Sequence, residues 1–159
     1  MNDIIDCFIH GSLFLILFFC AFRDWKEGII PNRYLMRGIE VRVFLLLFEV
    51  LLEGFESILH LLMKAFIGIL IFLGGILIRK MTGNGLGMGD IKLFSVMVLY
   101  LSAREWIEAL FYSCIFCMTL AFGLFCIKKP RNKFPFAPAV FLSSFFIALQ
   151  RYVLSEMQW

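Results

Sequence analysis

"IIDCFIHGSLFLILFFCAF", residues 4–22, is an apolar stretch whose one acidic residue is Asp6. At about 1.5 Å of helical rise per residue, a stretch of this length approaches the roughly 30 Å thickness of the hydrocarbon core of a bilayer. The preceding residues lack the basic region of a secretory signal, and Ala21-Phe22-Arg23 is not a small-residue cleavage site. We therefore expect a transmembrane helix that is retained in the protein.

The composition extends this expectation to the whole chain. Of its 159 residues, 62% are hydrophobic and 17% are charged, and the mean hydropathy is +0.91, far above the average of soluble globular proteins. No long polar stretch could fold as a separate soluble domain. The sequence predicts one all-α membrane domain covering residues 1–159.

Five further hydrophobic runs follow, and charge placement indicates how they are arranged. Two are doubtful spans, because residues 38–52 contain Glu40, Arg42 and Glu49 and residues 90–101 are short. Basic residues cluster after the first, third and fifth runs, and the positive-inside rule places such clusters in the cytoplasm. They share one face if all six runs cross, which predicts six transmembrane helices with both termini outside. The runs are 38–52, 58–78, 90–101, 106–127 and 135–153, and the basic residues are Arg23, Lys26, Arg33, Arg37, Arg79, Lys80, Lys92, Lys128, Lys129, Arg131 and Lys133.

The loop "TGNGLGMGDIKLF", residues 82–94, places a carboxylate, Asp90, at the edge of an apolar run. An ionisable group in such a place is costly and indicates a functional site. The glycines match neither GxGxxG nor GxxxxGK, so a nucleotide site is not expected. Glycine instead permits close approach of backbone, which suits an extended substrate strand lying along the loop.

A second carboxylate, Asp24, ends the first run on the same predicted face as Asp90. Two neighbouring carboxylates cannot both ionise cheaply, so one can act as a base toward water while the other, protonated, donates to a scissile carbonyl. The sequence does not assign these two roles. Asp90 could also be the N-cap of the run that follows it.

Other hydrolytic chemistries find no support in the sequence. HExxH is absent, no serine lies in a GxSxG context, and the CxxC formed by Cys114 and Cys117 lies in an apolar run without a second pair. We therefore expect no metal and no other cofactor.

Three motifs in order along the chain carry a family resemblance. They are Asp24 followed by Ile30-Pro31-Asn32, Gly87-Met88-Gly89-Asp90 with Lys92 behind it, and Phe134-Pro135-Phe136-Ala137-Pro138. Together they resemble the type IV prepilin peptidases, GxGD-type aspartic proteases that include the archaeal preflagellin peptidases. The resemblance implies that Asp24 and Asp90 are catalytic. It also implies that short basic leaders are removed from pilin-like precursors, just before the apolar helix of the precursor, at the cytoplasmic side of the cell membrane.

The resemblance has one departure. Longer family members carry a cytoplasmic insert with paired cysteines that accompanies methylation of the new N-terminus, and no such insert precedes Asp24 here. The chain is similar to the short, dedicated peptidases of pilus systems. We expect peptidase activity without methyltransferase activity.

The remaining motif residues are expected to bind substrate or to shape loops. Lys92 could instead extend toward lipid headgroups, as lysines at helix ends often do. Pro31 and Asn32 have the composition of a turn. The expected set is Gly87, Gly89, Lys92, Pro31, Asn32, Pro135 and Pro138.

Expected partners are prepilin-like proteins and membrane lipid, including anionic lipid, and nucleic acid is not expected. The sequence leaves the oligomeric state open. An alternative function is a small transporter or channel that uses Asp24 and Asp90 as an ion or proton relay. A third is a catalytically silent scaffold for pilus assembly.

Overall fold

The computed structural model of the chain describes residues 2–83, 87–126 and 136–156, and its regular elements there are all α-helices. The predicted all-α class is therefore confirmed. The six helices are α1 (Asn2–Glu27), α2 (Asn32–Glu53), α3 (Glu56–Met81), α4 (Met88–Met97), α5 (Ala103–Cys126) and α6 (Ala137–Glu156).

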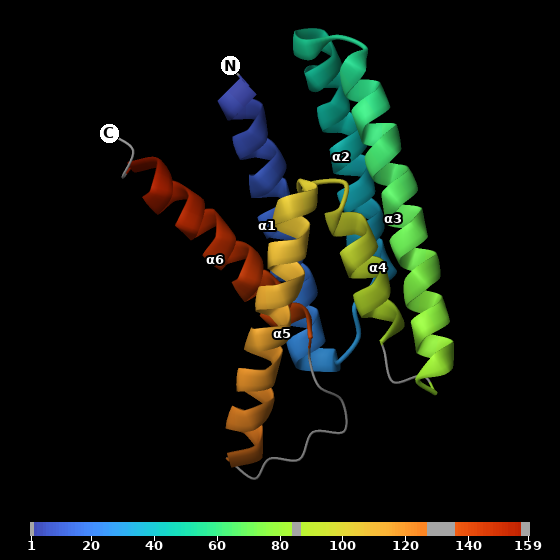
Figure 1. Cartoon of the computed structure of the whole chain (residues 1–159), viewed down its shortest axis with the longest axis vertical. Coiled ribbons are helices and arrows are strands. Elements are labelled where there is room, and N and C mark those ends of the chain that lie inside the picture. Colours follow the sequence, from blue (N-terminus) through green and yellow to red (C-terminus); the bar gives the residue numbers. More distant parts are fainter. Residues whose placement is uncertain (1, 84–86, 127–135, 157–159) are drawn as a thin grey trace.

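Successive helices run in opposite directions (Figure 1). The α1–α2 connection and the end of α3 lie in the lower half of the view, where α4 and α6 also begin, and α5 ends further down. α1 packs against α2 and α6, α5 packs against α6, and α4 packs against α3 and α2. The ends of α1 and α3 and the beginnings of α4 and α6 therefore lie at one end of the bundle.

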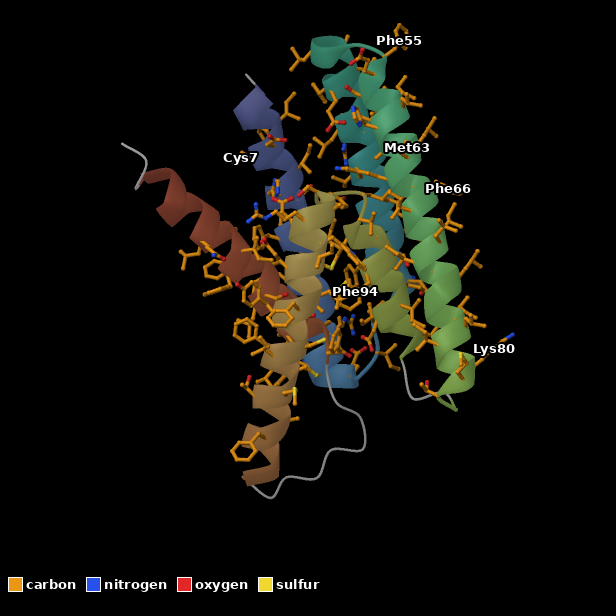
Figure 2. The ribbon with its side chains drawn as sticks, viewed as in Figure 1. Cys7, Phe55, Met63, Phe66, Lys80 and Phe94 are labelled. Carbon is orange, nitrogen blue, oxygen red and sulfur yellow. The ribbon has the colours of Figure 1, made fainter. Side chains whose placement is uncertain are left out.

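Three helices are long and apolar enough to cross a membrane. They are α1 over Ile5–Glu27, α3 over Glu56–Met81 and α5 over Ala103–Gly123. Large apolar side chains of α3, among them Met63 and Phe66, project away from the other helices (Figure 2) and are more than half exposed. Such a surface suits lipid, so this is a membrane protein.

The fourth run is shorter than predicted. α4 ends at Met97, and residues 98–102 form a turn in place of the helix expected to residue 101. At about 1.5 Å per residue, ten residues measure about 15 Å, half the hydrocarbon core. The α4–α5 connection accordingly lies well below the α2–α3 connection in Figure 1.

Charged residues of α2 hold the α4–α5 connection in place. Arg42 is 4% exposed, and its Nη2 lies 3.0 Å from Oε1 of Glu49, two turns further along α2. Its Nε donates to the carbonyl oxygen of Leu99 at 2.8 Å. Carbonyls at the C-terminal end of a helix lack partners within the helix, so Arg42 satisfies one just beyond α4.

The core joins α4 to α1 and α6. Its fully buried side chains include Leu17 and Cys20 of α1, Leu93 and Met97 of α4, and Val140 of α6. This packing fixes the beginning of α4 relative to the end of α1, where the two candidate aspartates lie.

Candidate active site

Asp24 lies in the last turns of α1 and is 6% exposed. Its Oδ2 accepts a hydrogen bond of 2.9 Å from the backbone N–H of Ala137, the first residue of α6. The first N–H groups of a helix have no partners within it, and the helix dipole places partial positive charge there. This environment stabilises a carboxylate in its ionised form.

Asp90 is the third residue of α4, which places it in the first turn. The N-cap position belongs to Gly87, so the alternative that Asp90 caps this helix is wrong. Asp90 lies outside the three apolar spans. Burial, and second the charge of Asp24, raise the pKa of its carboxyl from 3.8 to about 7.

The fold therefore brings Asp24 and Asp90 within range of each other's charge although they are 66 residues apart in the sequence. Their surroundings differ. Asp24 accepts a hydrogen bond from the N-terminus of a helix, whereas Asp90 is half-buried and its pKa is raised chiefly by burial. Near neutral pH this arrangement suits one ionised and one protonated carboxyl.

The two glycines before Asp90 make room for specific neighbours. A Cβ on Gly87 would lie 2.5 Å from Oδ2 of Asp90, so the carboxylate turns back over the bare backbone of this residue. A Cβ on Gly89 would lie 3.0 Å from Cβ of Ile30, in the α1–α2 connection. One glycine accommodates the carboxylate, and the other allows α4 to approach the end of α1.

Lys92 and Asn32 connect two of the motifs. Nζ of Lys92 donates to Oδ1 of Asn32 at 3.0 Å, which joins the first turns of α4 and α2. Pro31 is the N-cap of α2. The hydrogen bond of Lys92 thus goes to the first residue of α2, and of the two residues Asn32 is exposed and Lys92 is half-buried.

Of the two predicted prolines near α6, the structure places one. Pro138 is the second residue of α6, in the first turn, where a missing N–H leaves no helical hydrogen bond unmade. Pro135 lies outside the described residues, as do the basic residues Lys128, Lys129, Arg131 and Lys133.

One feature of the site and one feature of the surrounding fold were missed in the sequence. The first is the backbone N–H of Ala137, which donates to Asp24. Any residue except proline has such a donor, so the amino-acid type at this position does not predict the bond. The second had a visible signal, because Ser102 and Glu105 have the Ser-x-x-Glu spacing of a capping box. The N–H of Ser102 donates to Oε2 of Glu105 at 2.8 Å and the N–H of Glu105 donates to Oγ of Ser102 at 3.4 Å, which begins α5 at a defined place.

Comparison with known protein families identifies the family of the chain. A family model described as "Type IV leader peptidase family" matches residues 11–122, more than half of the chain. The matched range contains Asp24 and Asp90 and ends before α6. Comparisons with curated proteins and with solved structures gave no significant match.

Proposed function

Because this chain belongs to the type IV leader peptidase family, we propose that it is an aspartic endopeptidase that removes the short basic leader from prepilin-like precursors. Asp24 and Asp90 are the catalytic pair in this proposal. The observation that carries it is the placement of two carboxyls from distant parts of the chain within range of each other's charge, Asp24 buried beside a helix N-terminus and Asp90 half-buried with a raised pKa.

The two environments suggest the role of each carboxyl. Asp24, ionised, accepts a proton from a water molecule, whose oxygen attacks the scissile carbonyl carbon. Asp90, protonated, gives its proton to the carbonyl oxygen and stabilises the tetrahedral intermediate. When the C–N bond breaks, the proton on Asp24 passes to the leaving amine and Asp90 regains its own. Water is consumed and both carboxyls return to their starting states.

The proposed location is the cytoplasmic face of the cell membrane. Basic residues lie in the helix ends next to the connections after α1 and α3, at the same end of the bundle as the two aspartates; they include Lys26, Arg33 and Lys80. In this proposal all six helices run between the two membrane faces, with both termini outside. α4 covers only part of that depth, and Arg42 holds the turn that follows it inside the bundle.

A transporter that uses the same aspartates as a relay is the weaker candidate. Family membership favours peptide hydrolysis. Within α2, Arg42 forms an ion pair with Glu49 and donates a hydrogen bond to the carbonyl oxygen of Leu99. These contacts hold the end of α4 against α2, which is a structural role.

The experiment is cleavage of a pilin-type precursor by purified protein in detergent, with EDTA present. Wild type should release the leader, whereas Asp24→Asn and Asp90→Asn should each lose at least about 1,000-fold in rate, as expected when one member of an acid–base pair is removed. Glu27→Gln is the matched control, because Glu27 is an exposed carboxylate one turn beyond Asp24 on the same helix. Full activity in either aspartate variant would contradict the proposal that Asp24 and Asp90 are the catalytic pair.

We also propose that the chain does not methylate the new N-terminus. Incubating precursor, protein and S-adenosylmethionine should give a cleaved product whose mass carries no added methyl group. A product heavier by one methyl would contradict this part of the proposal.

A further inference from the structure

An apolar groove lies beside Asp90, between α3 and α5. Its volume is about 340 Å³, and Asp90 is the one charged residue among the described residues that line it. α3 contributes Gly74, Gly75 and Ile78, and α5 contributes Trp106 and Leu110. An occupant of this groove would therefore be apolar along its length and would meet a single carboxyl.

Aromatic side chains form one wall of the groove. Phe94, which lies between α4 and α5 (Figure 2), has its ring centroid 6.2 Å from that of Trp106 and 5.7 Å from that of Phe136. Nε1 of Trp106 donates to the carbonyl oxygen of Phe94 at 3.1 Å, so its polar atom is already satisfied. This wall offers apolar contact and no free hydrogen-bonding group from Trp106.

The groove opens on the surface that meets lipid. Ile78 and Leu110, on its two sides, are 54% and 37% exposed. Both belong to helices long and apolar enough to cross a membrane. A polypeptide segment embedded in the bilayer could therefore enter from the side without passing through water.

Two adjacent glycines have different roles here. A Cβ on Gly75 would lie 2.5 Å from Cγ2 of Ile91, so Gly75 is needed where α3 meets α4. A Cβ on Gly74 would meet nothing within 4 Å. Gly74 therefore widens the groove and is not required for packing between helices.

We propose that this groove binds the apolar, membrane-embedded segment of the precursor next to the scissile bond, an inference that rests on the proposed peptidase function. Two other apolar grooves serve as comparisons. One, of about 550 Å³, lies between α2, α3 and α4, and one, of about 520 Å³, lies on α1 and α6. Neither has Asp24 or Asp90 in its described lining. Of these three grooves, the groove beside Asp90 is the one from which a bound segment reaches a candidate catalytic carboxyl directly.

The test places a large side chain at Gly74, so that it occupies part of the groove. Gly74→Leu should raise KM for the full-length precursor on the order of tenfold, the equivalent of losing burial of one large apolar side chain, with little change in kcat. Gly11→Leu is the matched control, because Gly11 is also a helical glycine with nothing within 4 Å and lines the groove on α1 and α6. If the wild type is active and Gly74→Leu has an unchanged KM, the proposal that this groove binds the precursor is wrong, whereas the proposed peptidase function still stands.

A second measurement does not depend on turnover. A photoreactive residue at Leu110, in the Asp24→Asn background, should crosslink to the apolar segment of the precursor, while the same residue at Phe145 of α6 should not. No crosslink at Leu110, or equal crosslinking at both positions, would overturn the proposal. If wild type fails to cleave while Leu110 still crosslinks, the hydrolytic function fails and the binding groove remains.

Discussion

Arg42 on α2 donates from Nε to the carbonyl oxygen of Leu99, 57 residues away, while its Nη2 pairs with Glu49. The bond lies just beyond the C-terminal end of α4, and Asp90 lies near the N-terminal end of the same helix. Arg42 is therefore a positioning residue that fixes a short helix from the end opposite the candidate site.

Arg42→Ala should destabilise the protein by about 3–5 kcal/mol, because it leaves the buried carboxylate of Glu49 without its partner. The measurement is thermal unfolding in detergent. Arg104→Ala is the control, since its pair with Glu108 is largely exposed and should change the melting temperature little. Equal melting temperatures for both variants would contradict the proposal that the contacts of Arg42 with Leu99 and Glu49 stabilise the fold.

Gly87→Ala should lower kcat by about 100-fold, because its Cβ would occupy space 2.5 Å from Oδ2 of Asp90 and displace the carboxylate. The melting temperature should change little, since α4 can begin with alanine. Gly123→Ala, where the added Cβ meets nothing within 4 Å, should leave kcat unchanged. A fully active Gly87→Ala would show that the carboxylate does not need this space.

Activity should fall as the pH rises through about 7. The proposed acid, Asp90, has a pKa raised to about 7 by burial and by Asp24, and it can donate a proton only below that value. The measurement is kcat/KM for precursor cleavage between pH 5 and 9. Glu27→Gln should keep the same alkaline limb. A rate that stays constant from pH 6 to 9 would contradict the role of Asp90 as the acid, and a rate that rises through pH 7 would reverse the assignment of acid and base.

Asp90→Asn should be more stable than wild type at pH 8. The unfolded carboxyl loses its proton near 3.8 and the folded one near 7, so wild-type stability decreases as the pH rises between these values and is constant outside them. Asparagine does not ionise and avoids this loss. Melting temperatures of both proteins at pH 4 and pH 8 test the point. A larger advantage for Asp90→Asn at pH 4 than at pH 8 would contradict it.

Much of the fold could be predicted because it depends on local composition. Apolar runs bounded by charges indicated six helices, and alternating basic loops placed Asp24 and Asp90 at one end. The early end of α4 could not be predicted, because residues 98–101 are as apolar as those before them. Its cause is tertiary, since the carbonyl of Leu99 is bonded to Arg42 of another helix.

The candidate site was predictable in its residue types and not in its electrostatics. Both carboxyls stand out in the sequence because they lie in motifs that carry the family resemblance. Their division into an ionised and a protonated partner depends on the N–H of Ala137 and on the burial of Asp90. Both are properties of packing between distant helices, so the sequence left the roles open.

The hydrogen bond from Ala137 to Asp24 also has an evolutionary consequence. Because the donor is main chain, every replacement of Ala137 that keeps the path of α6 preserves the bond, and proline alone would delete the N–H. The partner of this aspartate is thus inherited with the fold and not with an amino-acid identity. Divergent sequences could retain the same charge balance without sharing any side chain at this position.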